Sequence, residues 1–282
     1  MIVGLSKLLI NNIFSIIRIK NVMIALLCVV IAFLKINEDI LQVNSIITAS
    51  IIMLLMMGSN IINDIYDIDT DRINRPNRVL IQNPNLVKSF SAVCGAMILS
   101  AILLSFLLNI YSTLIVIISC PFLIGYSNFF KKTPIIGNLL VSFFLGLVFI
   151  FVAVSAEVAI MNILPEAFIA FSISFIREII KDVEDFSGDK ESNINTTAVF
   201  FGVKKTVYIG CFLIIGFCIQ CGYFIHYDFL KYYTLSLILL IFLPLFYLTY
   251  FLIKSPSISS CAKAAKLLKK VTFLGLLIIY IM

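Results

Sequence analysis

Long apolar runs separated by short polar segments fill the chain from end to end. A helix that crosses the hydrocarbon core of a bilayer needs about 20 mostly apolar residues, and the pattern supplies nine such runs. The predicted spans are 14–35, 42–64, 89–109, 111–129, 136–157, 163–182, 203–225, 230–253 and 267–282. No polar region is long enough to form a soluble second unit, so the pattern predicts one all-α transmembrane domain over residues 1–282.

Composition supports a chain whose solvent is lipid. Hydrophobic residues make up 61% of the sequence and charged residues 13%, with a mean hydropathy of +1.11. A water-soluble domain carries about 25% charged residues, and a chain of 282 residues could not bury this much apolar surface in water. The sequence therefore predicts a polytopic membrane protein.

The basic residues give the orientation of the spans. With the N-terminus inside and nine spans, all 21 basic residues except Lys35 and Lys231 fall on the inner side. Lys and Arg concentrate on the cytoplasmic side of membrane proteins. We therefore expect a cytoplasmic N-terminus and an outer C-terminus in the cell membrane. The net charge of +6 reflects this topology and gives no reason to expect a nucleic-acid partner.

Cysteine and histidine contribute little candidate chemistry. The pair Cys218 and Cys221 has C-x-x-C spacing, but it lies inside an uncharged helical run, where small packing residues are the simpler interpretation. His226 is the only histidine. Histidine-based acid–base or zinc chemistry is thus nearly excluded.

Most of the acidic residues lie in two short segments, 63–72 and 177–190, which close the second and sixth predicted spans on the inner side. Each segment holds three Asp at i, i+3 and i+7, and these offsets line one face of a helix. The two triplets are Asp64, Asp67 and Asp71 in the first segment and Asp182, Asp185 and Asp189 in the second. The repeated pattern suggests two related halves whose acidic ends face each other.

Clustered carboxylates at the edge of the hydrocarbon predict a bound cation. They repel one another, partial burial strengthens the repulsion, and a helix C-terminus already carries partial negative charge. Mg²⁺ takes oxygen ligands and shares its remaining positions with water and phosphate, and two clusters could hold ions that bridge a diphosphate. The alternative is a set of solvated charges paired with nearby bases. The matching spacing and membrane position of the two segments favour the metal site.

A diphosphate also needs positive side chains near the metal. Five basic residues on the inner face are candidates: Arg18, Arg72, Lys131, Lys132 and Lys190. Tyr126, which precedes Lys131 by about one helical turn, and Asn21, at the start of the first span, are candidate cavity residues.

These motifs resemble those of the UbiA superfamily of intramembrane prenyltransferases, over essentially the whole chain. The resemblance rests on N-D-x-x-D-x-x-x-D from Asn63, D-x-x-D-x-x-x-D from Asp182, Asn74-Arg75-Pro76, and Tyr126 followed by Lys131-Lys132. It implies nine helices around a central cavity that is capped on the cytoplasmic side. It also adds Asn63 to the six Asp as a Mg²⁺–diphosphate site. Within this site the expected catalytic residues are Asp67, Asp71, Asp185 and Asp189.

The second motif is similar to that of the archaeal digeranylgeranylglyceryl phosphate synthases in this superfamily. That likeness implies transfer of a geranylgeranyl group from its diphosphate to the glycerol hydroxyl of geranylgeranylglyceryl phosphate, a lipid phosphate. The stretch from Glu191 to Thr197 departs from the expected Gly and Thr-Leu-Pro, which leaves an aromatic, quinone-type acceptor as the alternative. An ion-coupled transporter is a more remote alternative. Transporter sites lie near the bilayer midplane on broken helices, whereas the acidic segments of this chain lie at the ends of predicted spans.

Overall fold

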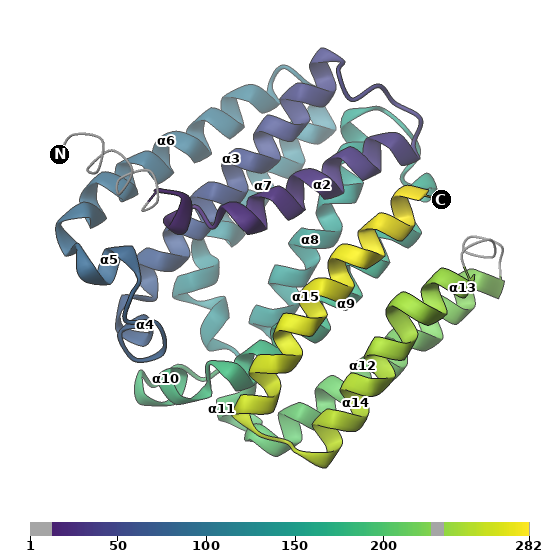
Figure 1. The fold of residues 1–282 in the computed structure, drawn as a ribbon. Coiled ribbons are helices and arrows are strands. Elements are labelled where there is room, and N and C mark those ends of the chain that lie inside the picture. Colours follow the sequence, from purple (N-terminus) through teal and green to yellow (C-terminus); the bar gives the residue numbers. More distant parts are fainter. Residues whose placement is uncertain (1–12, 227–233, 282) are drawn as a thin grey trace, which may run out of the picture.

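A computed structural model describes residues 13–226 and 234–281, and this part of the chain contains helices and no strand (Figure 1). The long helices are α2 (Ile19–Lys35), α3 (Val43–Tyr66), α6 (Val87–Ser105), α7 (Ile110–Asn128), α8 (Ile136–Ser155), α9 (Leu164–Glu184), α12 (Val203–His226), α14 (Leu243–Lys254) and α15 (Ile258–Ile281). The short ones are α4 (Ile68–Asn74), α5 (Val79–Gln82), α10 (Phe186–Glu191), α11 (Thr197–Phe201) and α13 (Thr234–Leu237), which a π-helical turn, Ile238–Phe242, joins to α14.

Six helical segments in the described residues are long and apolar enough to cross a membrane. They are Val43–Tyr66, Pro84–Ser105, Ile110–Asn128, Ile136–Ser155, Val203–Tyr223 and Leu235–Lys254. Large apolar side chains such as Leu103, Phe212 and Leu239 are exposed on their outer faces, as expected where lipid replaces water. The prediction of an all-helical, multi-pass membrane protein is confirmed.

The two ends of the described bundle differ from the predicted spans. The last helix begins at Ile258 and not at 267, because the segment is amphipathic: Cys261, Ala264 and Leu268 are buried while the lysines between them remain partly or fully exposed. A reading based on hydropathy takes those lysines for a loop. The first span, predicted from 14 to 35, is interrupted at Arg18, whose φ of 52° is left-handed, and α2 begins at the next residue.

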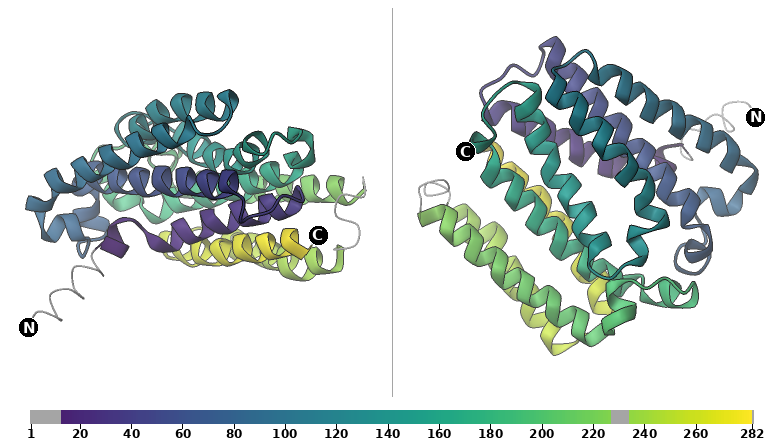
Figure 2. Two further views of the ribbon diagram at one scale, coloured as in Figure 1. Left: turned by 90° about the horizontal axis from the view of Figure 1, so that it is seen from above. Right: turned by 180° about the vertical axis from the view of Figure 1, so that it is seen from behind.

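The long helix α9 lies at the centre of the packing. It contacts α8, α12 and α15, while α3 packs on α6 and α2 packs on α3, α8 and α15. One apolar core joins α9 to α12, α14 and α15, and a second joins α9 to α2, α3, α7 and α8. Figure 2 shows the resulting bundle from two further sides. Segments far apart in the sequence therefore enclose one interior.

The short helices gather at one end of this bundle. Figure 1 shows α4, α5, α10 and α11 at the same end, and α4 packs directly against α10. Each acidic segment runs from the end of a long helix into one of these short ones, from α3 into α4 and from α9 into α10. This end of the bundle is therefore the polar one.

A close approach between α8 and α9 depends on Gly146. A Cβ atom at this position would lie 2.9 Å from the carbonyl oxygen of Ala167 and 3.3 Å from Phe171 Cβ, so α8 and α9 would have to move apart. We expect Gly146→Ala to destabilise the protein by about 1–3 kcal/mol. Thermal unfolding of detergent-solubilised protein measures this as a lower midpoint.

Gly216, inside α12, provides the matched control. A Cβ atom there meets nothing within 4 Å, so Gly216→Ala should leave the midpoint unchanged or raise it by removing a flexible residue from a helix. Equal midpoints for the two variants would contradict the packing argument.

Candidate active site

Each acidic motif bends at its middle aspartate. Asp67 separates α3 from α4 with φ −88° and ψ 6°, and Asp185 separates α9 from α10 with φ −87° and ψ 1°. The expectation that each triplet lines one face of a continuous helix is therefore wrong, because the backbone leaves the helix at the residue between the outer two. The nearly equal backbone angles place Asp67 and Asp185 in corresponding positions.

The two motifs meet at the polar end of the bundle. Arg75 connects them: its guanidinium lies 3.7 Å from an oxygen of Asp71 and donates a 2.7 Å hydrogen bond to Asp185 Oδ1. One side chain can make both contacts only if the motifs share one side of the molecule and lie within one ligand's reach. The predicted facing of the two acidic ends is present in this geometry.

Basic residues from three further segments neutralise the first motif. Arg18 donates a 2.6 Å hydrogen bond to Asp64, and Arg78 contacts both Asp64 and, at 3.3 Å, Asp71. Lys131 donates a 2.6 Å hydrogen bond to Asp67. The carboxylates of this motif thus point at cations.

Burial and neighbouring charges shift the pKa values of these groups. Burial raises the pKa of Asp71, and the nearby Arg78 offsets part of that rise. Burial lowers the pKa of Lys131, but the charge and hydrogen bond of Asp67 outweigh it, so the pKa is raised above its ordinary value. The ammonium of Lys131 therefore stays charged beside the acids.

In the second motif, Asp182 is held by hydrogen bonds. Its Oδ2 accepts from Asn138 Nδ2 at 3.0 Å and from the backbone N–H of Thr197 at 3.1 Å. The hydroxyl of Thr197 donates to Asn138 Oδ1 at 2.6 Å. This network fixes the segment after α10 to the start of α8.

The pKa of Asp189 is strongly raised, so its carboxyl group resists ionisation. Burial raises its pKa to about 7, which Lys131 partly offsets while Asp185 and Asp182 raise it further. Its Oδ1 is buried and accepts no well-formed hydrogen bond. An oxygen in this state suits a ligand that brings positive charge.

Three of the predicted diphosphate-binding side chains are exposed in the structure. Arg72 is exposed and pairs with Asp69 at 3.6 Å, Lys132 is exposed, and Lys190 lies over the ring of Phe186. Each of them directly follows a buried or half-buried residue, and one step along a helix turns the side chain by about 100°. Their placement gives no support to diphosphate binding.

Arg75 and Arg78 contact the aspartates instead. Neither was among the diphosphate-binding candidates chosen from the sequence. Both follow the first motif closely, and the loop after α4 folds them back onto it. Both bases follow the motif closely in the sequence, and Arg75 also belongs to the Asn74-Arg75-Pro76 motif. Closeness to the motif did not separate them from the other inner bases.

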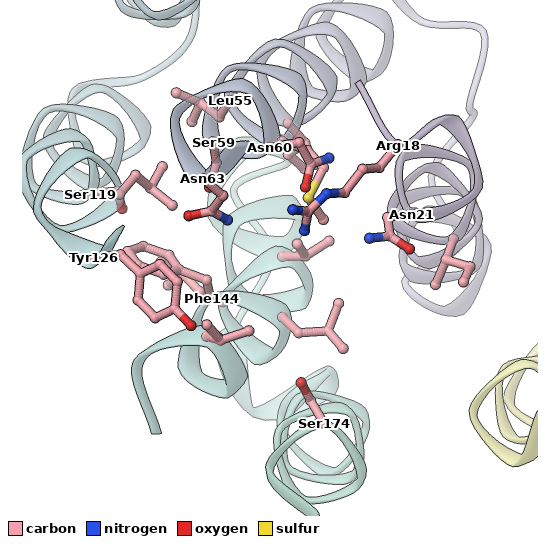
Figure 3. Close-up of a pocket in the computed structure, with 18 of the residues that line it drawn as sticks. Arg18, Asn21, Leu55, Ser59, Asn60, Asn63, Ser119, Tyr126, Phe144 and Ser174 are labelled. Atoms are coloured by element: carbon pink, nitrogen blue, oxygen red, sulfur yellow. The ribbon is translucent and has the colours of Figure 1, made fainter. Parts of the chain in front are cut away.

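An elongated cavity opens beside the motifs, with a volume of about 280 Å³. Arg18, Asn21, Asn63 and Tyr126 all line it, and in Figure 3 the Tyr126 hydroxyl and the Arg18 guanidinium point into it. Deeper walls are apolar, with Ile52, Leu55, Phe144, Leu145, Val148 and Phe151. The cavity therefore combines polar side chains near the motifs with apolar walls.

The donor set fits Mg²⁺. Carboxylate and amide oxygens are its preferred protein ligands, and the buried Asp189 Oδ1 without a hydrogen-bond donor is one such oxygen. Among the described residues no three His, Cys, Asp or Glu side chains converge on a single point, because the acids turn toward arginine and lysine. Metal coordination would therefore require these side chains to turn from their cations.

A family model for the UbiA prenyltransferase family matches residues 22–275. The chain belongs to this family. It is 31% identical over 265 residues to digeranylgeranylglyceryl phosphate synthase of Saccharolobus solfataricus, covering 90% of each chain. It is 33% identical over 271 residues to the protein of the same name from Methanococcus maripaludis, covering 94% of this chain and 95% of the relative. The chain is thus a UbiA-type prenyltransferase.

Solved structures share the fold. A structure from work on digeranylgeranylglyceryl phosphate synthase in membranes matches with a TM-score of 0.75 and 28% identity, covering 96% of this chain and 97% of the other. A UbiA homologue from Archaeoglobus fulgidus, bound to GPP and Mg²⁺, matches with a TM-score of 0.68 and 17% identity, covering 95% and 99%. At that identity the second likeness concerns the fold alone.

Proposed function

We propose that this chain transfers a geranylgeranyl group from geranylgeranyl diphosphate to the glycerol hydroxyl of geranylgeranylglyceryl phosphate, with Mg²⁺ as cofactor. The observation that carries the proposal is the meeting of two aspartate motifs, joined by Arg75, beside a cavity with apolar walls. The names of the relatives support the choice of both lipid substrates.

The proposed topology is a single domain over residues 1–282 with nine spans, to which α2, α9 and α15 contribute beside the six most apolar segments. The corresponding bends at Asp67 and Asp185 support two related halves. The gathering of basic residues at the polar end supports a cytoplasmic active site and N-terminus and an outer C-terminus.

The proposed metal ligands are the two Asp triplets and the amide that precedes the first. In order they are Asn63, Asp64, Asp67, Asp71, Asp182, Asp185 and Asp189. Mg²⁺, when bound, neutralises the diphosphate and makes it a better leaving group. Arg18, Arg75, Arg78 and Lys131, which the structure pairs with these acids, are placed to contact the diphosphate once the acids hold metal.

The chain's own residues then govern three steps. The cations stabilise the charge that grows on the departing diphosphate as the allylic C–O bond breaks, and so favour the transition state over the ground state. The apolar cavity walls exclude water, which would otherwise capture the allylic cation. The glycerol hydroxyl forms the new C–O bond with that cation, and its proton passes to the departing diphosphate or to a carboxylate of the motifs.

Product analysis tests the function. Detergent-solubilised protein with Mg²⁺ and geranylgeranyl diphosphate is offered geranylgeranylglyceryl phosphate or an aromatic quinone precursor, and products are separated by chromatography. We expect an ether product with the lipid phosphate. A prenylated ring as the only product would establish the aromatic acceptor. If the detergent-solubilised protein consumes no donor, transport is favoured, because transport needs a sealed membrane.

The raised pKa of Asp189 predicts a pH dependence. Because its pKa is about 7, the carboxyl is largely protonated at pH 6 and largely ionised at pH 8, and the proton competes with Mg²⁺. At subsaturating Mg²⁺ we expect transfer to rise about tenfold over this range. Raising Mg²⁺ should move the acidic limb to lower pH.

Asp189→Asn is the control for this competition. It removes the group whose pKa lies in the middle of this range, so its transfer rate should be low and should rise much less between these values than that of the wild-type protein. An acidic limb that does not move with Mg²⁺ concentration would contradict the assignment of Asp189 as a ligand.

A further inference from the structure

One face of α9 brings positive charge to the cavity. Ser174, Arg177, Glu178 and Lys181 all line the cavity, and their spacing places them on one side of a helix. Glu178 accepts hydrogen bonds from Arg177 at 2.6 Å and from Lys181 at 3.4 Å. In Figure 3 the Ser174 hydroxyl points into the cavity.

Lys269 adds a further cation from α15, the helix that packs beside α9. Its ammonium donates a 3.1 Å hydrogen bond to Asn21 Oδ1 on α2, an uncharged partner. It also lies near enough to Arg177 and Lys20 for their charges to repel it. A half-buried lysine beside other cations and a neutral amide favours an anionic ligand.

The charges match one kind of anion. Arg177, Lys181 and Lys269 carry three positive charges and Glu178 one negative charge, so these four side chains leave a net charge of +2 toward the cavity. A phosphate monoester carries about −1.5 to −2 at neutral pH and offers three acceptor oxygens. A carboxylate on an aromatic ring would balance only half of this charge.

This group differs in its hydrogen-bond partners from the cations that contact the Asp triplets. Arg75, Arg78 and Lys131 each contact an aspartate of those motifs. Lys269 instead contacts Asn21, across the cavity from Tyr126 and Asn63. The cavity therefore has two differently equipped polar regions.

We propose that Arg177, Lys181 and Lys269 bind the phosphate monoester of the acceptor lipid. This inference rests on the proposed function and specifies where it places the second substrate. The acceptor's head then lies between α2, α9 and α15, its hydroxyl faces the donor diphosphate, and its apolar chain follows the apolar walls.

Lys269→Gln tests the site, because Gln keeps a donor for Asn21 and removes the charge. Steady-state kinetics with geranylgeranylglyceryl phosphate should show a KM for the acceptor raised about tenfold or more, as loss of a charged hydrogen bond predicts. The KM for the donor and kcat at saturating acceptor should change by less than about twofold. Lys269→Arg should restore most of the affinity.

Two controls separate charge recognition from general damage. Lys270→Gln changes the neighbouring, exposed lysine on the same helix and should behave as the wild-type protein. Geranylgeranylglycerol, which lacks the phosphate, should be a poor acceptor for the wild-type protein and an equally poor one for Lys269→Gln.

Equilibrium binding keeps the inference distinct from the proposed function. Geranylgeranylglyceryl phosphate is titrated into wild-type protein and Lys269→Gln without donor or Mg²⁺. Weaker binding by the variant supports the phosphate site, whether or not an ether product forms. Absence of the ether product would contradict the proposed function and leave the binding result unaffected. Equal affinity, or an equal acceptor KM, for wild-type protein and Lys269→Gln would overturn the inference while leaving product formation intact.

Discussion

Alanine in place of Asp67 or Asp185 is expected to lower prenyl transfer by about 10³-fold or more, because each change removes a carboxylate on which the diphosphate site depends. Both residues stand at a bend between two helices and are partly exposed, so the protein should still fold. The measurement is the transfer rate at saturating Mg²⁺ and substrates. Size-exclusion elution and the unfolding midpoint report on folding.

Asp69→Ala is the matched control within the same motif. Its side chain is 85% exposed and pairs only loosely, at 3.6 Å, with the exposed Arg72, so its loss should change transfer by less than about twofold. Near-wild-type turnover by Asp67→Ala or Asp185→Ala would refute the metal–diphosphate assignment. So would a loss of activity by Asp69→Ala as large as theirs.

Removal of divalent metal should produce an effect of similar size. We expect a chelator to abolish transfer and added Mg²⁺ to restore it, because without metal the diphosphate is a poor leaving group. Ca²⁺ should restore less, since it is larger and forms longer bonds than the octahedral geometry of Mg²⁺ allows. The transfer rate against free metal concentration measures both effects.

The same experiment has a structural readout. Asp64, Asp67 and Asp185 each pair with an arginine or lysine in this structure. These acids therefore have cationic partners that do not depend on metal, and chelation should leave the unfolding midpoint nearly unchanged. Persistent transfer with excess chelator would contradict the cofactor assignment. Unfolding on chelation would indicate that metal holds the fold and would leave its chemical role open.

Hydropathy was sufficient to locate the helices, because in lipid a span has to be apolar along most of its length. It failed where a helix is polar on one side, as at the start of α15, where buried Cys261 and Leu268 alternate with lysines. It also failed at Arg18, where one left-handed residue interrupts an otherwise continuous apolar run. Such a break depends on tertiary contacts that hydropathy does not contain.

The aspartates of the site could be predicted from the sequence, but only some of the arginines and lysines that contact them could. Aspartates are rare in this chain, so their repeated spacing stands out. Bases are common on the inner face, and their long side chains leave the choice to tertiary structure. Arg75 and Arg78 reach the acids, while Arg72 turns away. Arg18 and Lys131, two of the bases selected from the sequence, contact Asp64 and Asp67.

The wall that α15 supplies has a consequence for biosynthesis. Both acidic motifs precede α15 in the chain, and α15 carries Lys269 to Asn21 on α2. While the ribosome is still translating the segment from Ile258 onward, the earlier helices already contain every aspartate of the two motifs. The cavity between α2 and α9 still lacks the wall that α15 forms. The nascent protein thus gains its carboxylates first and closes its interior last.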